Sequence, residues 1–242
     1  VCALLAGGGQ AELAVAPEAQ AMPLPDTVDL VTAAALPEVS ATVWSNLVMI
    51  AGLTQGETVL IHGGASGVGT MAIQVARALG AQVVTTAGPA EKVARCRALG
   101  AHVAVSFRDE DWVAATLDAT NGRGADVILD IMGAAYLERN VNALATGGRL
   151  VIIGLQGGTT AELNLSALLT KRATIHATSL RSRPLAEKAE ICSAVVAGLW
   201  PLIAAGKVEP GIHTTLRMNQ VAEAHLLVAN NEHIGKVLLT TA

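Results

Sequence analysis

A glycine-rich segment is the part of this sequence best suited to hold a phosphate group. It directly follows an apolar run and reads Gly63-Gly64-Ala65-Ser66-Gly67-Val68-Gly69. Glycines let the backbone turn sharply and approach a pyrophosphate, whose charge then lies on the N–H groups that begin the next helix. The segment therefore predicts a dinucleotide-binding turn, although Ser66 stands where the plain G-x-G-x-x-G pattern has its middle glycine.

Three other interpretations fit the same segment less well. A nucleophile elbow around Ser66 would need glycine at position 68, which is valine. A P-loop would need a lysine after its last glycine, and Gly69 is followed by Thr70. A methyltransferase also uses a glycine-rich first turn, but it prefers an acidic residue at the end of the second strand. Residues 86–89 are Thr-Ala-Gly-Pro, so no acid stands there.

The same strand end indicates which dinucleotide is bound. An NAD enzyme places Asp or Glu about 20 residues beyond the motif, where the carboxylate binds the ribose hydroxyls. Without a carboxylate a 2′-phosphate is not repelled, and Lys92 and Arg95, one helical turn apart, supply positive charge to neutralise it. Glu91 weakens that field, and a solvated helix face is the alternative interpretation of the two cations. The sequence favours NADP(H) over NAD(H).

Six short apolar runs form the framework that must position this turn. They predict strands at 58–62, 82–87, 102–106, 126–131, 149–154 and 174–178, and the first five are separated by stretches of helical period. Strands that are apolar on both faces and separated by helices predict a parallel sheet covered on both sides. Six of them predict the α/β doubly wound (Rossmann) fold with strand order 3-2-1-4-5-6.

The flanking segments do not continue this alternation. Residues 10–37 predict a short strand around 13–15 and extended or coil structure rather than helix, and one amphipathic helix is predicted over 36–51. After residue 180 we expect a helix over 185–205, a helix over 221–229 and a strand over 236–240. These last elements are not expected to form a further βαβ unit.

Composition excludes several classes of partner. The net charge is −4 and the basic residues are scattered, so no nucleic-acid partner is expected. Every apolar run is broken before about 18 residues, so no membrane span is expected. The three cysteines lie far apart in the sequence, so no disulfide framework is predicted. No histidines are spaced i, i+3 or i, i+4, so no metal site is predicted either. A cytoplasmic setting fits these cysteines best.

His62 follows a predicted buried strand. It is therefore expected to be a packed, hydrogen-bonded residue rather than a base.

Several separate motifs, in order, resemble the zinc-free quinone oxidoreductase (zeta-crystallin-like) branch of the medium-chain dehydrogenase/reductase superfamily. They cover nearly the whole sequence and lie at 33–38, 61–69, Lys92 with 99–101, 129–133, 140–142, 180–183 and 234–237. The resemblance implies hydride transfer from NADPH to a quinone. The alternatives are NADPH-dependent reduction of enones or 2-alkenals, and NADPH binding without turnover.

The resemblance also implies cofactor-binding positions, but no catalytic residue. The pyrophosphate would be held by Ser66, Gly67, Val68 and Gly69, and the 2′-phosphate by Gly88 and Lys92. The remaining positions follow the cofactor from adenosine to carboxamide: Phe107 and Arg108, Met132 and Gly133, Gly154 and Leu155, Ser179, Leu180 and Arg181, and finally Thr42. Pro89 and Phe107 depart from the family's frequent Ser and Tyr or His, which removes two hydrogen-bonding groups from the adenosine end.

By the same resemblance the chain should contain two domains and form a homodimer. Residues 37–181 are expected to be the Rossmann domain, and 1–36 with 182–242 the remainder of a GroES-like β-barrel substrate domain, so the chain is expected to begin inside that barrel. The strand at 174–178 ends the sheet order, and its outer edge carries unpaired N–H and C=O groups. Ile175 makes this edge apolar enough to be buried against a second copy.

Overall fold

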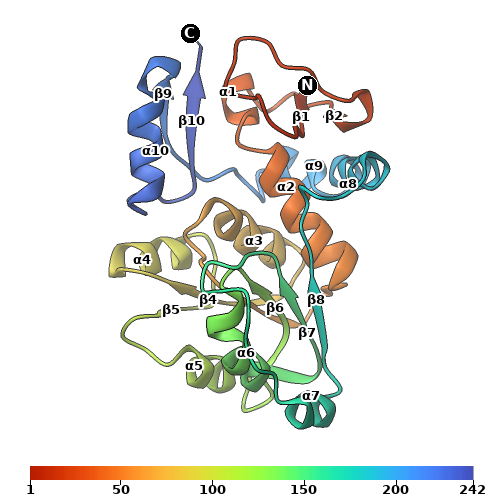
Figure 1. Cartoon of the computed structure of the whole chain (residues 1–242), viewed down its shortest axis with the longest axis vertical. Helices are drawn as coiled ribbons and strands as arrows, with labels where there is room; N and C mark the ends of the chain where they lie inside the picture. Colours follow the sequence, from red (N-terminus) through yellow and green to blue (C-terminus); the bar gives the residue numbers. More distant parts are fainter. Residues whose placement is uncertain (242) are drawn as a thin grey trace. The chain divides into compact units, whose positions relative to one another are not determined.

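The computed structural model describes residues 1–241 and separates into two compact units. The first unit comprises Val1–Trp44, Ser66–Met71 and the residues from Leu180 onward. The second comprises Ser45–Ala65 and Ala72–Ser179. Of the residues 37–181 expected in the Rossmann domain, 37–44, 66–71, 180 and 181 group with the first unit. Figure 1 draws the elements of both units with their labels.

The second unit is built on a six-stranded sheet. Its order is β5-β4-β3-β6-β7-β8, which in chain order is 3-2-1-4-5-6, and every neighbouring pair is parallel. This confirms the predicted doubly wound α/β fold. The strands are β3 (Thr58–Ile61), β4 (Gln82–Ala87), β5 (Val103–Ser106), β6 (Ala125–Asp130), β7 (Leu144–Ile152) and β8 (Thr174–Ala177).

Helices cover both faces of this sheet, as its apolar strands require. Figure 1 shows β5 between α4 and α5, and α5, α6 and α7 pack against one another in succession. A core of large side chains, among them Trp112 of α5 with Leu60 and Ile128, fills the space under these helices. The helices are α3 (Gly67–Ala78), α4 (Ala90–Ala98), α5 (Trp112–Ala119), α6 (Leu137–Ala143) and α7 (Leu165–Lys171), with a 3-10 turn, η3 (Gly133–Tyr136).

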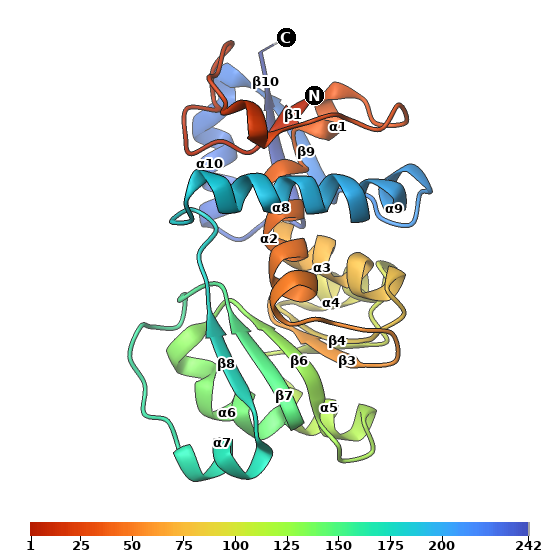
Figure 2. The ribbon, with the colours of Figure 1, turned by 90° about the vertical axis from the view of Figure 1, so that its right-hand side faces the viewer.

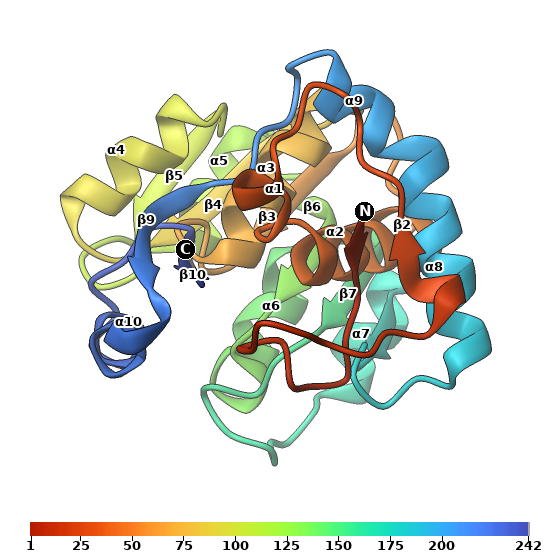
Figure 3. The same cartoon turned by 90° about the horizontal axis from the view of Figure 1, so that it is seen from above.

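The first unit consists of short strands and helices. β1 pairs with β2 antiparallel, and β9 pairs with β10 parallel. Figure 3 shows α10 beside these last two strands. The elements are β1 (Cys2–Ala3), η1 (Glu18–Gln20), β2 (Ala21–Met22), α1 (Leu30–Ala33), α2 (Pro37–Val43), α8 (Leu185–Gly198), α9 (Trp200–Ala204), β9 (Ile212–Arg217), η4 (Met218–Gln220), α10 (Val221–Ala229) and β10 (Lys236–Thr240).

Two predicted helices are interrupted. The helix expected over 36–51 is α-helical only to Val43 and continues as a π-helical segment, η2 (Trp44–Ile50). The helix expected over 185–205 breaks at Leu199, and α9 begins anew with Pro201 in its first turn, where a missing N–H costs no hydrogen bond. Figure 2 shows α8 and α9 as consecutive helices.

The other errors lie in irregular or polar segments. No strand forms around 13–15, and the four-residue α1 forms where no helix was predicted, because Asp29 caps it by accepting from Val31 N and Thr32 N. β7 begins five residues before the predicted 149, because Leu144 already pairs with Ala125 of β6; the register then shifts, and regular pairing resumes at Arg149. The sequence did not predict β9. This strand pairs in parallel with β10, so β9, α10 and β10 form a βαβ unit, contrary to prediction.

Candidate functional site

The carboxyl edge of the sheet gathers most of the predicted site residues of the second unit. All six strands are parallel, so the residues after their last positions lie along one edge, where open α/β sheets bind ligands. The predicted residues that follow β4, β5, β6, β7 and β8 there within three positions are Gly88, Phe107, Arg108, Met132, Gly133, Gly154, Leu155 and Ser179.

The turn after β3 runs close to the neighbouring strand. Gly63 has a positive φ of 71°. A Cβ on Gly64 would lie 2.2 Å from Thr85 Oγ1 and 3.0 Å from Cys96 Sγ, so only glycine fits. Gly64 N donates to Thr86 O at 2.8 Å and holds the turn against β4. The glycines thus serve both the sharp turn and the close packing that a phosphate-binding turn needs.

Ser66 caps the helix that follows this turn. Its Oγ accepts from Gly69 N at 3.0 Å, and its carbonyl accepts from Thr70 N at 2.9 Å. This explains why serine replaces the middle glycine of the common pattern. The first N–H groups of a helix have no intrahelical partner. Those of Gly67 and Val68 are therefore the groups in this turn suited to an anion.

Lys236 of the first unit, to which no role was assigned from the sequence, lies beside the start of this helix. A Cβ on Gly67 would lie 2.9 Å from Lys236 Cδ, and Ser66 pairs with Gly235 in a parallel bridge. Lys236 Nζ is 3.2 Å from Glu38 Oε2, and Thr42 Oγ1, predicted to meet the carboxamide, donates to Glu38 Oε1 at 3.0 Å. The motif at 234–237 was the feature of the sequence that could have pointed to this lysine, because it lies at the start of the last predicted strand.

A cationic corner forms where β4 and β5 end. Lys92 is only 7% exposed, and burial lowers its pKa, with Glu91 opposing and Arg108 reinforcing that shift. The Arg108 guanidinium lies over the Phe107 ring at 5.8 Å, and a Cβ on Gly88 would meet only that ring. The structure therefore brings together four predicted adenosine-side residues and gives Lys92 a cationic neighbour in Arg108. Arg95, the partner expected from helical spacing, is exposed on α4.

The loops after β6 and β7 pack on each other through glycines. A Cβ on Gly133, whose φ is +71°, would lie 2.7 Å from Leu155 Cδ2, and one on Gly154 would lie 2.8 Å from Ile131 O. Asp130 orders the first loop by accepting from Met132 N at 2.8 Å and Gly133 N at 2.9 Å. Burial raises the pKa of this carboxyl. Asp130 thus serves as a turn residue that orders this loop.

His62 is a packed residue, as expected. It is 2% exposed, and its ring nitrogens lie 3.1 Å from Thr86 Oγ1 and 2.8 Å from Asn140 Oδ1. Trp112 and Tyr136 meet its ring edge to face at centroid distances of 4.7 and 4.8 Å. Burial lowers its pKa to about 4.

This depressed pKa predicts a pH-dependent stability. An unfolded His62 takes up a proton below its ordinary pKa of 6.5, whereas the folded one resists protonation down to about 4. Its contribution is therefore complete above pH 6.5 and is lost as the pH falls toward 4, at up to about 1.4 kcal/mol per pH unit. Urea unfolding between pH 7 and 4.5 should show a shallower decline in His62→Gln than in the exposed control His225→Gln. Equal declines would contradict the assignment.

Comparison with known proteins places the chain in a family. The sequence profile of the zinc-binding dehydrogenases matches residues 67–195, more than half of the chain. The chain belongs to the zinc-binding dehydrogenase family. This confirms the predicted medium-chain dehydrogenase/reductase superfamily, whose members are oxidoreductases.

Relatives of this zinc-binding dehydrogenase chain include a polyketide synthase and single enzymes. It is 34% identical over 225 residues to highly reducing polyketide synthase AN6791 of Emericella nidulans, covering 91% of the chain and 9% of that protein. A solved NAD-dependent alcohol dehydrogenase is 32% identical with a TM-score of 0.85, covering 97% of this chain and 66% of its own. Escherichia coli quinone oxidoreductase complexed with NADPH is 28% identical with a TM-score of 0.81, covering 91% and 68%. The chain spans about a tenth of the length of the curated polyketide synthases it matches.

The family name implies zinc, but the residues of this chain do not fit such a centre. Within residues 1–241, no three His, Cys, Asp or Glu side chains lie close enough together to hold a metal ion. The three cysteines in that part are all buried and free of disulfides. No helix among these residues is long and apolar enough to cross a membrane.

Proposed function

We propose that this chain binds NADPH and passes its hydride to a conjugated carbonyl acceptor, with a quinone as the first candidate. The main support for this proposal is the corner after β4. Lys92 and Arg108 lie there, and the end of the strand has no carboxylate. A carboxylate would select NAD(H) through the ribose hydroxyls, whereas cations suit a 2′-phosphate. The NADPH complex of the E. coli relative supports the same choice.

Each part of the site has a task in this proposal. The first turn of α3 donates N–H groups to the pyrophosphate, and the Lys236 ammonium neutralises its charge. Phe107 offers an apolar surface to the adenine, and Arg108 with Lys92 binds the 2′-phosphate. Met132, Gly133, Gly154 and Leu155 flank the ribose and nicotinamide, and Ser179, Leu180, Arg181 and Thr42 bind toward the carboxamide. NADPH supplies the hydride when bound, and the protein supplies orientation and exclusion of water.

A quinone accepts this hydride readily, because two electrons and two protons convert it to an aromatic hydroquinone. One proton accompanies the hydride from solvent, and NADP⁺ is released. A second candidate is an α,β-unsaturated thioester, reduced by hydride addition at the β carbon and protonation at the α carbon. The highly reducing polyketide synthase relative favours this candidate.

Steady-state NADPH oxidation with duroquinone and with the crotonyl thioester of N-acetylcysteamine tests the two candidates. We expect faster turnover with duroquinone. Faster turnover with the thioester would replace the quinone by the second candidate. NADPH binding without oxidation by either compound would contradict the reductase proposal and leave cofactor binding alone.

Lys92→Ala is expected to remove most of the preference for NADPH. The buried ammonium pairs with the 2′-phosphate and contributes about tenfold or more in affinity, which is 1.4 kcal/mol or more. The dissociation constant for NADPH should rise about tenfold while that for NADH stays constant, as measured by fluorescence titration. Arg95→Ala is the matched control on the same helix and should change neither value. A Lys92→Ala variant that keeps its preference would rule out this role.

The homodimer through β8 remains part of the proposal. Among the described residues, β8 is the last strand of the sheet and pairs on one side only, with β7. Its outer edge can therefore pair with a second copy across a two-fold axis. We expect light scattering at micromolar concentration to give a dimer mass. Ala177→Lys, on the exposed end of the strand, should give the monomer mass at an unchanged melting temperature. A wild-type monomer, or a dimer that survives this change, would contradict the arrangement.

A further inference from the structure

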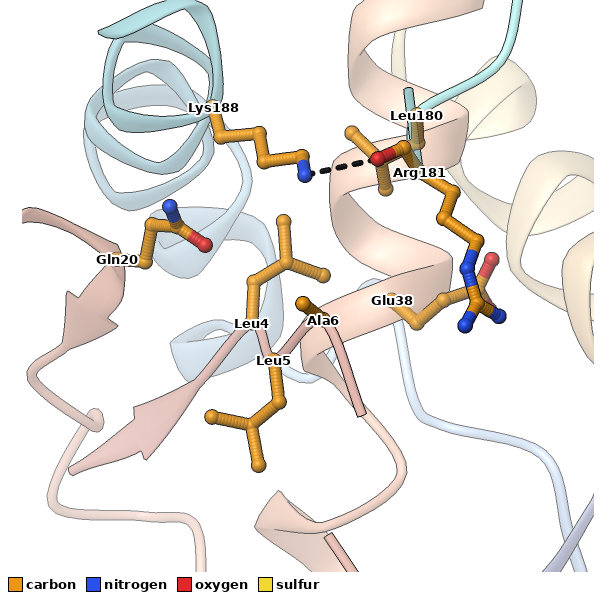
Figure 4. Close-up of a pocket in the computed structure, with 8 residues that line it drawn as sticks. All are labelled: Leu4, Leu5, Ala6, Gln20, Glu38, Leu180, Arg181 and Lys188. Atoms are coloured by element: carbon orange, nitrogen blue, oxygen red, sulfur yellow. Dashed lines mark hydrogen bonds between the residues drawn. The ribbon is translucent and has the colours of Figure 1, made fainter. Parts of the chain in front are cut away.

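A cavity of about 240 Å³ in the first unit has an unexplained set of polar side chains. Its wall is formed by the N-terminal segment, α2, the residues after Ser179 and α8 (Figure 4). Two donors and three leucines matter for its chemistry: Gln20, Lys188, Leu4, Leu5 and Leu180.

Gln20 is a buried residue with an unpaired amide nitrogen. It is 2% exposed, and among the described residues its Nε2 has no hydrogen-bond partner. A buried donor left unpaired is costly, so each such group in a native structure calls for an explanation. A ligand in the cavity that this residue lines would supply the missing acceptor.

Lys188 adds a second donor from α8. It is 8% exposed and donates to Arg181 O at 2.9 Å, which uses one of the three donors of its ammonium. Figure 4 shows this ammonium between Leu4 and Leu180, with the Gln20 amide on the other side of Leu4. A hydrogen bond to the backbone would explain the position of Lys188, but it does not explain the unpaired amide of Gln20.

The charge of the cavity favours an acceptor oxygen. Lys188 and Arg181 both line it, and the one carboxylate in its lining is that of Glu38. This carboxylate already accepts from Thr42 and lies 3.2 Å from Lys236 Nζ. The leucines offer the remaining surface to an apolar body. The volume is below the 300–1,000 Å³ of sites for drug-sized molecules, so a single ring fits and a long chain does not.

We infer that this cavity binds a monocyclic quinone, with one carbonyl oxygen accepting from Lys188 Nζ, the other from Gln20 Nε2, and Leu4, Leu5 and Leu180 against the ring. The inference rests on the proposed function for the identity of the ligand. A carboxylate on a small ring also offers acceptor oxygens to these donors. The experiment therefore compares a quinone with a ring carboxylate.

The test measures binding of duroquinone and of benzoate by saturation-transfer NMR, separately from NADPH binding by fluorescence. Lys188→Met and Gln20→Leu should each weaken duroquinone binding about tenfold, the effect of one lost hydrogen bond in a buried site. Neither should change the affinity for NADPH. Gln20→Leu should keep or raise the melting temperature, because it removes an unpaired buried donor; a loss of ligand binding in that variant is then not a loss of fold.

Matched controls are Gln10→Leu and Lys207→Met, exposed residues of the same unit. Unchanged duroquinone affinity in both cavity variants, or no binding of either probe by the wild type, would overturn the inference. Binding of benzoate alone would overturn the quinone assignment. If the protein failed to bind NADPH while both cavity variants bound duroquinone more weakly, the proposed function would be wrong and the cavity assignment would stand.

Discussion

Replacement of Gly67 by valine is expected to raise the dissociation constant for NADPH about a hundredfold, or about 2.7 kcal/mol. Gly67 begins α3, and a Cβ there would lie 2.9 Å from Lys236 Cδ. A branched side chain would displace the lysine and occupy the space over the first N–H groups of the helix. Two charge-assisted contacts to the pyrophosphate would be lost together, each worth roughly 1.5 kcal/mol or more.

Gly7→Val is the matched control for this change. Gly7 lies in the same unit, and a Cβ there would meet nothing within 4 Å. Fluorescence titration should show normal NADPH affinity in the control and a large loss in Gly67→Val, with the same circular dichroism spectrum in both. Normal affinity in a folded Gly67→Val protein would show that this turn does not hold the cofactor.

Gly235→Val should destabilise the chain by about 2–5 kcal/mol. Its φ is +83°, and a Cβ would lie 2.2 Å from Gly211 O, a backbone atom that cannot turn away. Left-handed backbone in a bulky residue costs about 1–2 kcal/mol, and overpacking costs about 1–3 kcal/mol more. Since Lys236 follows directly, the same change should also weaken NADPH binding.

The control for Gly235 isolates the overlap from the backbone conformation. Gly206 also has a positive φ, +67°, but a Cβ there would have nothing within 4 Å. Urea unfolding should therefore show a loss of only about 1–2 kcal/mol in Gly206→Val. Equal losses in the two variants would mean that the contact with Gly211 has no energetic role.

The order of the sheet could be predicted because four of its six strands, β3, β4, β5 and β6, are short, mostly buried runs that alternate with helical stretches. β4, α10 and β10 have the predicted bounds. β9 could not be found as a buried run, since alternate residues along it are exposed and several are polar. The break at Leu199 depends on a single proline. The π-helical segment after Val43 has no sequence periodicity that distinguishes it from an α-helix.

The site was predictable where its residues follow strand ends and not where distant segments meet. The glycine turn and the missing carboxylate are local features, and both could be read from the sequence. Helical spacing pointed to Arg95 as the partner of Lys92, whereas the structure gives it Arg108 from the end of the adjacent strand. Lys236 reaches Gly67 only through the bridge between Ser66 and Gly235, a contact that no sequence spacing encodes.

The carboxyl edge of this sheet is expected to bind NADPH in preference to NADH. The most direct measurement is a pair of fluorescence titrations of the wild-type chain with the two cofactors, at one ionic strength and pH. The cations at the corner after β4 predict that NADPH binds at least about tenfold more tightly, by 1.4 kcal/mol or more. Equal affinities, or tighter binding of NADH, would contradict the account.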